Sequence, residues 1–594
     1  TWDSLLTLRL TNQNQYWFDA DSMLMPRRLY RAGKLAAPPP VEVGDDFRLI
    51  DHLGRSRSLY YFLNATNMRA FVLIFTCNGC GKVRDMAPTI RALTNRFATN
   101  GVTFWMVDSN LGDTRSNILA EAVALGFGNG PPILHDPAQI VARRYHASTA
   151  PEAIALKRTV AGSVTNMTIF YRGAIDDRLG SNATATTQFY LSNALSSFLA
   201  GAPITSVAVR PGGCDIAFRP VTPVTYSDDV APILLSKCVR CHSPGNIAPF
   251  SFSSHSSVQG HATQIRKALL AGEMPPWHAD PNYGAFSNDS SLTPEQAAKL
   301  VQWIDEGSQR GGGPDPLTGY TPPVDYPITW PAALGTPDFV LTLPTQSIPA
   351  SGVLSYRYVT NVYSGPTTWL RAAIVLPGTL SVVHHVLFLN DDGGMGSSFF
   401  TGYVPGTEPL AFPTDTGKRV TNGQRFVAQM HYISMGRATN DITRIGFYFM
   451  ASPPAAPLIQ SSAFNLFFGI PPGTNDYQTT AQSATFAKTV YLYDMSPHMH
   501  LRGSRFQFEA VYPAGHVPAR EILLSVPRYD FSWQTPYRLA QPKLLPAGTS
   551  IQCTGAWDNS YLNPDNPNPN TAVFWGDQTF NEMFIGYFSY SEVP

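Results

Sequence analysis

The chain has few charged residues, no excess of one charge and no long apolar run. Charged residues make up 14% of its 594 positions, and 42 basic side chains balance 42 acidic ones. This balance gives no overall field that would attract nucleic acid or an anionic membrane. No apolar run approaches the roughly 18 residues that a transmembrane helix needs. We therefore expect no nucleic-acid partner and no transmembrane segment.

Proline and glycine, in contrast, are abundant. The 50 prolines and 46 glycines suit β-rich domains joined by extended linkers, and the hydrophobic content of 44% indicates packed domains rather than disorder. The length is too great for one core and predicts several domains. The sequence begins at Thr1 without methionine, which is expected of a chain whose signal peptide has been removed.

Only six cysteines are present, and four of them form two CxxC pairs. The single ones are Cys214 and Cys553. A disulfide between these two is one interpretation, but isolated buried thiols are favoured.

The first CxxC pair, Cys77 and Cys80, lies in an alternating strand and helix pattern. Residues 70–75 and 102–108 read as buried strands, and residues 86–98 as an amphipathic helix. A thiol between the first strand and this helix faces the positive end of the helix dipole, which favours the thiolate. The pattern favours a redox-active dithiol over a structural disulfide or a fragment of a metal site.

Residues 41–200 resemble the thioredoxin/peroxiredoxin-like superfamily. The segment STAPEAIAL is similar to the one that carries the superfamily's cis-proline, here Pro151. The resemblance implies an α/β thioredoxin-like domain, assigned to residues 41–212. A peroxidase in which Cys77 attacks is the less favoured alternative.

The second CxxC pair belongs to CVRCH, residues 238–242, which is the signature for covalent attachment of haem. Cys238 and Cys241 would form the thioethers, and His242 would bind the iron. A short helix is expected before the motif, another ending at Met274, and a capped one over residues 292–308. A zinc-site fragment would need a further Cys/His pair, which is missing nearby.

Residues 223–312 resemble the small c-type cytochromes, and we assign residues 213–312 to such an α-helical domain. The resemblance implies one haem c per chain, with Met274 favoured over His278 as the second axial ligand. Haem is attached to CxxCH motifs outside the bacterial cytoplasmic membrane. The expected location is therefore the periplasm, the cell surface or the exterior.

A Gly/Pro-rich linker, residues 313–337, precedes a region of short alternating strand patterns. These patterns predict two tandem antiparallel jelly-roll domains, residues 338–470 and 471–594. Five of the six histidines in this region form three clusters: His384 and His385, His431, and His498 and His500.

The spacing of these histidines predicts metal ligands. Side chains at i and i+2 share one face of a strand, so His498 and His500 can converge on one ion. The adjacent His384 and His385 point to opposite faces of an ideal strand, and binding one ion requires a bulge, twist or strand end. Imidazole suits zinc and copper alike, whereas an additional thioether ligand selects copper.

Residues 338–594 resemble the type II copper monooxygenase family, which includes peptidylglycine α-hydroxylating monooxygenase. The family implies two copper ions per chain and two separate sites. The electron-transfer copper would be bound by His384, His385 and His431, and the O₂-binding, catalytic copper by His498, His500 and Met583. Ser496 stands where the peptide-amidating members carry a carboxylate-binding arginine. Peptide amidation is therefore not expected.

The expected function is O₂-dependent hydroxylation of an unknown small-molecule or peptide-like substrate. The haem would replace an ascorbate-like electron donor, because fusion raises a donor's effective concentration. The alternatives are a non-catalytic electron-transfer or copper-storing protein and a structural one. Residues 1–40 match no motif, and an assembly arm is the hypothesis for them.

Overall fold

The computed structural model describes residues 43–593, apart from positions 66, 129, 162–163, 180–185, 206–208, 245, 321–326, 353, 392–398, 406–408 and 410. The chain divides into two compact units. The first ends at Pro223 and includes Leu270–Gly272, and the second holds Val224–Leu269 and the chain from Glu273 onward. The assembly arm expected at residues 1–40 lies outside the described residues.

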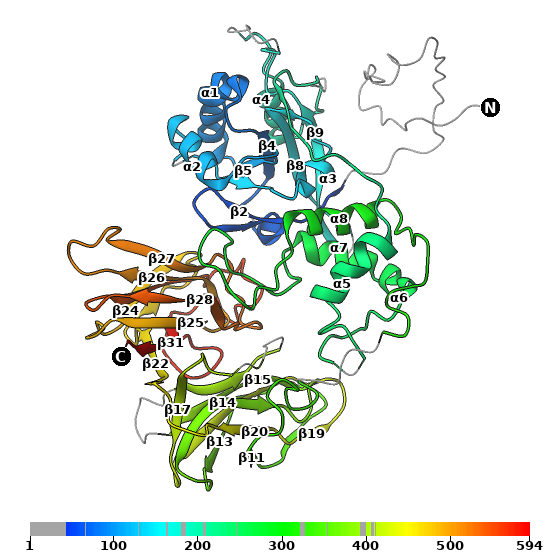
Figure 1. Cartoon of the computed structure of the whole chain (residues 1–594). Helices are drawn as coiled ribbons and strands as arrows, with labels where there is room; N and C mark the ends of the chain where they lie inside the picture. Colours follow the sequence, from blue (N-terminus) through cyan, green and yellow to red (C-terminus); the bar gives the residue numbers. More distant parts are fainter. Residues whose placement is uncertain are drawn as a thin grey trace. The chain divides into compact units, whose positions relative to one another are not determined.

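The first unit is built on a mixed eight-stranded sheet (Figure 1). In sheet order its strands are β1 (Val43–Gly44), β9 (Val164–Gly173), β8 (Glu152–Ala161), β4 (Ala70–Thr76), β5 (Val102–Asp108), β6 (Ile133–His135), β2 (Arg48–Asp51) and β3 (Ser56–Ser58). The central strands β4, β5 and β6 are parallel, while β8 and β9 run antiparallel to β4 and to each other. A two-stranded sheet joins β7 (Thr149–Ala150) to β10 (Cys214–Asp215).

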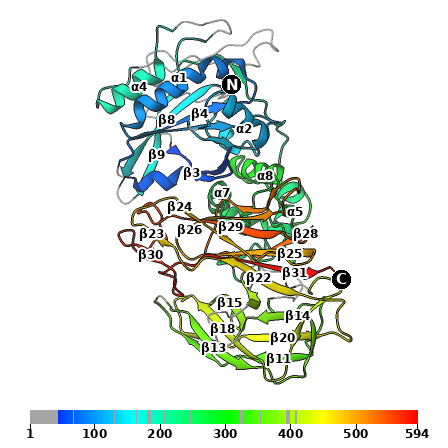
Figure 2. The same cartoon turned by 90° about the vertical axis from the view of Figure 1, so that its left-hand side faces the viewer.

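Helices pack on this sheet through alternate residues of β4. They are η2 (Tyr60–Asn64), α1 (Gly81–Ala98), α2 (Arg115–Ala124), α3 (Ile140–Arg144) and α4 (Tyr190–Leu199). Val72 and Ile74 share one buried cluster with Ile90 of α1 and Leu195 of α4, and both helices lie on the same side of the sheet (Figure 2). On the other face, Phe71 packs edge-on against a tryptophan of β5.

The first unit has a thioredoxin-like fold, as the sequence predicts. Strands β4 and β5 match the expected ranges, and the helix between them begins earlier than expected, at Gly81. The Ala150–Pro151 peptide bond is cis, as the resemblance implies. The expected end of this domain at residue 212 is wrong, because β10 pairs with β7 and the unit extends to Pro223.

The second unit begins with short helices: η3 (Tyr226–Val230), α5 (Ala231–Lys237), α6 (His255–Gly260), α7 (Ala262–Leu270) and α8 (Pro294–Asp305). They enclose a small core that includes Leu234, Leu300 and Trp303. The capped helix expected at residues 292–308 is confirmed, since the Thr293 side chain caps α8. The helix expected to end at Met274 ends earlier, at Leu270, because Gly272 adopts a positive φ of 63° and interrupts it.

Two β-sandwiches follow in the second unit. The first pairs a five-stranded sheet with a four-stranded one, and β12 (Gln346–Ile348) joins β19 (Thr439–Asp441) beside them. The larger sheet holds β11 (Phe339–Thr342), β20 (Arg444–Phe449), β14 (Thr368–Leu376), β17 (Thr416–Val420) and β21 (Ala456–Pro457). The smaller holds β13 (Arg357–Val362), β18 (Arg425–Tyr432), β15 (Val383–Asn390) and β16 (Phe399–Tyr403). Val375, Phe388, Phe426 and Phe447 fill the core between the sheets.

The second sandwich consists of two four-stranded sheets and the short pair β23 (Gly469–Ile470) and β30 (Val573–Phe574). One sheet holds β22 (Ile459–Phe464), β31 (Ile585–Glu592), β25 (Val490–His498) and β28 (Tyr537–Leu545). The other holds β24 (Tyr477–Gln482), β29 (Ser550–Trp557), β26 (Gly503–Val511) and β27 (Arg520–Val526). The boundary between the two sandwiches, expected at residue 470, lies earlier in the chain, because β22 already belongs to the second sandwich through its pairing with β31.

The chain is therefore multidomain and mostly β, with few helices. Among the residues that the structure describes, no helix combines the length and apolar character needed to cross a membrane.

Candidate metal centre and haem cavity

Three histidines of the first sandwich gather at one point. His384 and His385 lie on β15, and His431 lies on the neighbouring strand β18, directly opposite His385. The register shifts between Val383 and His385, which is the irregularity that two adjacent ligands require. One ring nitrogen from each histidine lies within 4.8 Å of the others, and the Nδ1 atoms of His384 and His385 are 3.2 Å apart. We call these residues the three-histidine group.

The chemistry of the three-histidine group fits a metal ion. His385 is 1% exposed, and its Nε2 and the Nδ1 of His431 have no hydrogen-bond partner among the described residues. Burial lowers the pKa of His431 to about 3 and that of His385 well below its usual value. Neutral imidazoles with unsatisfied buried nitrogens around a common point are good ligands for zinc or copper.

The second pair of histidines, His498 and His500, lies at the end of β25 in the second sandwich. The Nδ1 of His498 donates to Gln534 Oε1 at 2.6 Å, and the Nδ1 of His500 donates to the Asn581 carbonyl at 3.3 Å. These bonds leave both Nε2 atoms as ligand atoms, and the Nε2 of His500 is buried without a partner among the described residues. Between them, Met499 packs into the sandwich core. We call His498 and His500 the histidine pair.

Met583 follows the residue that holds His500 in place. Glu582 accepts the backbone N–H of His500 at 2.9 Å and the indole N–H of Trp557 at 3.0 Å. Ile585, the first residue of β31, pairs with His498, the last residue of β25, and Met583 lies two residues before Ile585 in the chain.

Two aromatic rings separate the three-histidine group from the histidine pair. The Phe531 ring centroid lies 5.8 Å from that of His431 and 5.9 Å from that of His500. The Tyr356 centroid lies 5.0 Å from His431 and 6.4 Å from His500. The two groups therefore share two aromatic neighbours, and His385 lies near enough to His498 and His500 to interact with them electrostatically.

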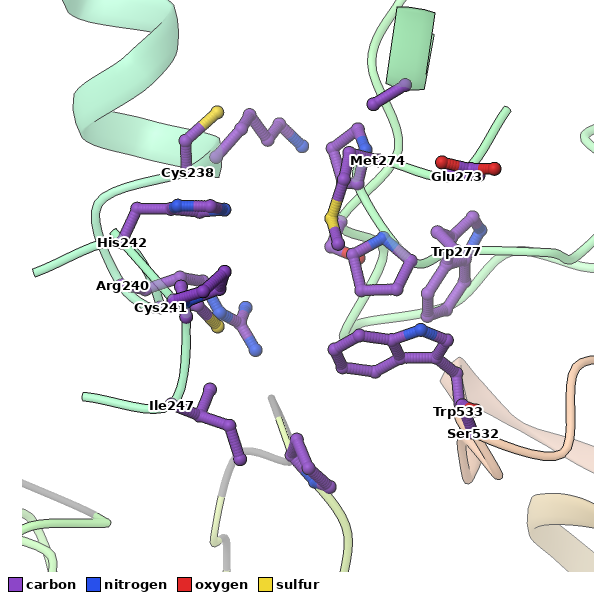
Figure 3. A pocket seen from close by; sticks show the side chains of 18 of the residues that line it. Cys238, Arg240, Cys241, His242, Ile247, Glu273, Met274, Trp277, Ser532 and Trp533 are labelled. Carbon is purple, nitrogen blue, oxygen red and sulfur yellow. The ribbon is translucent and has the colours of Figure 1, made fainter. Parts of the chain in front are cut away.

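The CVRCH motif borders a largely apolar cavity of about 480 Å³, which we call the CVRCH cavity (Figure 3). Cys238 caps the C-terminus of α5, and Cys238 and Cys241 both carry free thiols. The Nδ1 of His242 donates to the Phe250 carbonyl at 3.1 Å, and its ring stacks on Phe252. This leaves Nε2 for a ligand.

Met274 lines the CVRCH cavity, with its side chain on the side opposite His242 (Figure 3). His278, the competing axial ligand, lies in the described part of the chain but does not line the cavity. The volume is in the range of small-molecule and cofactor sites, about 300–1,000 Å³. Two free thiols, one oriented imidazole and one thioether around an apolar cavity fit a covalently bound haem.

The thiols of the first unit are arranged differently from the expectation. Cys80 is bonded to Cys214, and the sulfur of Cys77 lies within 4.8 Å of both. The interpretation of Cys214 as an isolated thiol is therefore wrong, and so is a Cys214–Cys553 disulfide, whereas Cys553 is a buried free thiol, as expected. The reason is that β10 pairs with β7 and brings Cys214 to the start of α1.

The thiolate expected at Cys77 is also not favoured by its surroundings. Cys77 is 5% exposed, and burial raises the pKa of its thiol to about 12. The carboxylates of Asp108, Asp113 and Glu121 contribute a smaller part of this rise in the pKa. These effects outweigh the helix dipole, because α1 begins only at Gly81.

Sequence reasoning missed several residues that complete these sites. Phe531 and Gln534 lie in the segment before β28, and Tyr356 precedes β13. Their residue types carry no metal-binding signal, and only the tertiary arrangement brings them next to the histidines.

No protein-family model matches the chain. No curated protein matches it either. Solved structures are similar over part of it.

Three such structures illustrate the range. A crystal structure of an uncharacterized conserved protein from Geobacillus kaustophilus is 27% identical and covers 31% of this chain and 94% of its own, with a TM-score of 0.27. A thiol:disulfide interchange protein from Bacteroides sp. is 20% identical, and the match covers 20% of this chain and 75% of that protein, with a TM-score of 0.18. A secreted Mycobacterium tuberculosis disulfide oxidoreductase is 15% identical, and the match covers 26% of this chain and 95% of that protein, also with a TM-score of 0.18.

Proposed function

We propose that this protein is an extracytoplasmic copper-dependent monooxygenase that hydroxylates a C–H bond of a small-molecule or peptide-like substrate. The observation that carries the proposal is the presence of two histidine groups, one on each sandwich, with the Phe531 ring between them. This arrangement agrees with the two sites that the resemblance to type II copper monooxygenases with tandem jelly rolls implies. Copper bound there would supply one-electron redox chemistry and reaction with O₂.

The three-histidine group would serve the electron-transfer ion. Its ligands are all imidazoles, and the β15–β18 ladder fixes His385 and His431 opposite each other. Because these rings are buried and neutral, no proton has to leave before an ion binds.

The histidine pair would serve the ion at which substrate reacts. Gln534 orients His498, and Glu582 fixes the backbone of His500. Met583 would add a thioether, which favours copper, and Cu(I) in particular.

A second cavity, of about 360 Å³, reaches His498 and offers space for a substrate. Ser496, Tyr587 and Phe399 are among its lining residues, and most of the wall is apolar. Ser496 provides a hydroxyl where a carboxylate-binding arginine would be needed for peptide amidation. The lining also includes the cationic side chains of Lys418 and Arg538 and the carboxyl group of Asp494, so a largely apolar substrate that carries polar groups fits this cavity.

The CVRCH cavity supports a haem c as the electron donor, re-reduced by a redox protein or an ascorbate-like reductant. The need for haem attachment also supports the periplasm, the cell surface or the exterior as the location. The thiols of Cys77 and Cys80, together with Cys214, would belong to a separate dithiol relay on the thioredoxin-like unit.

A second candidate is a non-catalytic electron-transfer or copper-binding protein. The burial of the ligands favours it, because His385 and His500 are each 1% exposed. The cavity beside His498 favours the monooxygenase.

Oxygen uptake separates the two candidates. The full chain, loaded with copper and supplied with an ascorbate-like reductant, is expected to consume O₂ well above a copper blank. His498→Ala should abolish this uptake. His516→Ala is the matched control, since His516 lies in the same sandwich but bonds to the Pro518 carbonyl, away from both groups. Copper bound without O₂ uptake would reject the monooxygenase and favour the second candidate.

A further inference from the structure

The three cysteines clustered in the first unit differ in exposure. Cys77 and Cys80 are 5% and 3% exposed, whereas Cys214 is half-buried. The three sulfur atoms all lie within 4.8 Å of one another, and Cys80 is bonded to Cys214 while Cys77 keeps a free thiol. Cys214 is therefore the more accessible partner of the disulfide.

The backbone of Cys214 is held by hydrogen bonds that do not depend on the disulfide. Cys214 pairs with Ala150 in the ladder between β10 and β7. Just after this ladder, the Ile216 N–H donates to the Ser148 carbonyl at 2.9 Å. Opening the disulfide therefore leaves this stretch of chain anchored beside the cluster.

The buried side chain of Gln139 anchors the residues that follow. Its Nε2 donates to the Ala217 carbonyl at 2.7 Å, and its Oε1 accepts the Arg219 N–H at 2.8 Å. Gln139 is 1% exposed, so water does not compete well for these bonds.

Two glycines allow the segment to approach the CxxC motif closely. A Cβ atom on Gly213 would lie 2.0 Å from the Ala150 carbonyl oxygen, and one on Gly212 would lie 1.6 Å from the Leu179 carbonyl oxygen. Backbone atoms this near leave no room for a side chain, so glycine is required at both positions. The glycine pair places Cys214 within reach of Cys80.

Acidic groups surround the other end of the cluster, at Cys77. The Asp113 Oδ2 accepts the Asn78 N–H at 3.0 Å, and the Glu121 Oε1 accepts the Gly79 N–H at 2.9 Å. Both carboxylates interact electrostatically with the Cys77 thiol. The attacking species in disulfide exchange is a thiolate, and these negative charges oppose its approach from this side.

We propose that Cys214 is the residue through which the first unit exchanges disulfides with an external dithiol, while the CxxC motif acts behind it. One thiolate of the dithiol attacks the Cys214 sulfur and forms a bond to it; the Cys80–Cys214 bond breaks, and Cys80 leaves as a thiolate that takes up a proton. The second sulfur of the dithiol then attacks the first, closing the dithiol into a disulfide and releasing Cys214, which also takes up a proton. The dithiol loses two electrons and the protein disulfide gains them.

This role differs from the one that the resemblance to thioredoxin-like proteins implies, in which Cys77 would meet the partner. It rests on the dithiol relay of the proposed function and involves neither copper nor haem. A failure here would therefore leave the monooxygenase proposal untouched, and the absence of O₂ uptake would not affect the role of Cys214.

A trapping experiment on the unmodified full chain tests this role without any variant. The folded protein is incubated with glutathione, quenched in acid and mapped by peptide mass spectrometry, which separates the cluster from the cysteines of the CVRCH motif. Glutathione should be found on Cys214 at least about tenfold more often than on Cys80, because Cys214 is the more exposed. Glutathione mainly on Cys80, or a disulfide that opens only in denaturant, would overturn the proposal.

Two variants separate Cys214 from Cys77 as the point of contact. Cys77→Ser keeps the Cys80–Cys214 disulfide and should still trap glutathione on Cys214. Loss of trapping in this variant would show that Cys77 meets the partner and would overturn the proposal. Cys553→Ser is the matched control, because Cys553 is a buried free thiol of the second unit, and it should trap like the wild type.

Two dithiols show which source of reducing thiols the site accepts. Dithiothreitol and a reduced peptide with a CxxC sequence are compared at the same thiol concentration, without denaturant. Reduction of the Cys80–Cys214 disulfide by either one supports the proposal, with the faster reagent marking a small or a polypeptide donor. Reduction by neither would overturn it.

Discussion

Gln534→Leu should weaken copper binding at the histidine pair and leave the three-histidine group unchanged. Gln534 is 6% exposed, and its Oε1 accepts the Nδ1–H of His498 at 2.6 Å. Loss of one buried hydrogen bond that orients a ligand costs about 1–3 kcal/mol. This corresponds to a roughly 10–100-fold loss of metal affinity, the range seen for residues that orient ligands.

The assay is an anaerobic competition of Cu(I) against a chelator, in the His431→Ala background, so that only the histidine pair binds copper. Gln429→Leu is the matched control: Gln429 is 7% exposed and donates one hydrogen bond, to the Tyr358 hydroxyl at 3.0 Å. The control should keep the affinity of its background. Equal affinities for Gln534→Leu and Gln429→Leu would refute the role given to Gln534.

Three further predictions concern charge, thiols and haem. Burial lowers the pKa of Lys418 from 10.5 to about 8, so the unfolded chain binds a proton between these values that the folded chain has released, and stability rises with pH there. Relative to Lys418→Met, the free energy of unfolding of the wild type should rise by about 3 kcal/mol across this pH window, at 1.36 kcal/mol per pKa unit. Urea unfolding that gives the same difference between the two proteins at about pH 7 and at about pH 10 would contradict this. Cys214→Ser should free Cys80 to pair with Cys77, which peptide mapping under non-reducing conditions detects; two free thiols after mild oxidation would argue against exchange. Met274→Ala should keep the covalent haem but remove the sulfur-to-iron absorption band of the oxidised protein, and an unchanged band would exclude Met274 as ligand.

Short-range sequence patterns predicted much of the fold. Buried strands such as β5 and the capping residue of α8 can be read from a few neighbouring residues. The sequence places the end of α7 too late, at Met274, whereas the helix ends at Leu270 and Gly272 adopts a positive φ.

The sites divide in the same way. The histidines and the CVRCH motif carry their signal in residue type and spacing, and the structure brings His384, His385 and His431 together. The Cys80–Cys214 bond spans a sequence separation of 134 residues and depends on the pairing of two short strands. No local pattern encodes such a long-range approach, and the same holds for Phe531.

The metal content of the purified full chain tests the central claim most directly. The chain should be expressed with haem attachment, loaded with copper and freed of loosely bound metal, and its copper, zinc and iron should be measured per chain. Two copper ions and one iron per chain are expected, with the copper falling to one in His431→Ala. Zinc in place of copper, or copper content that does not change in this variant, would contradict the account.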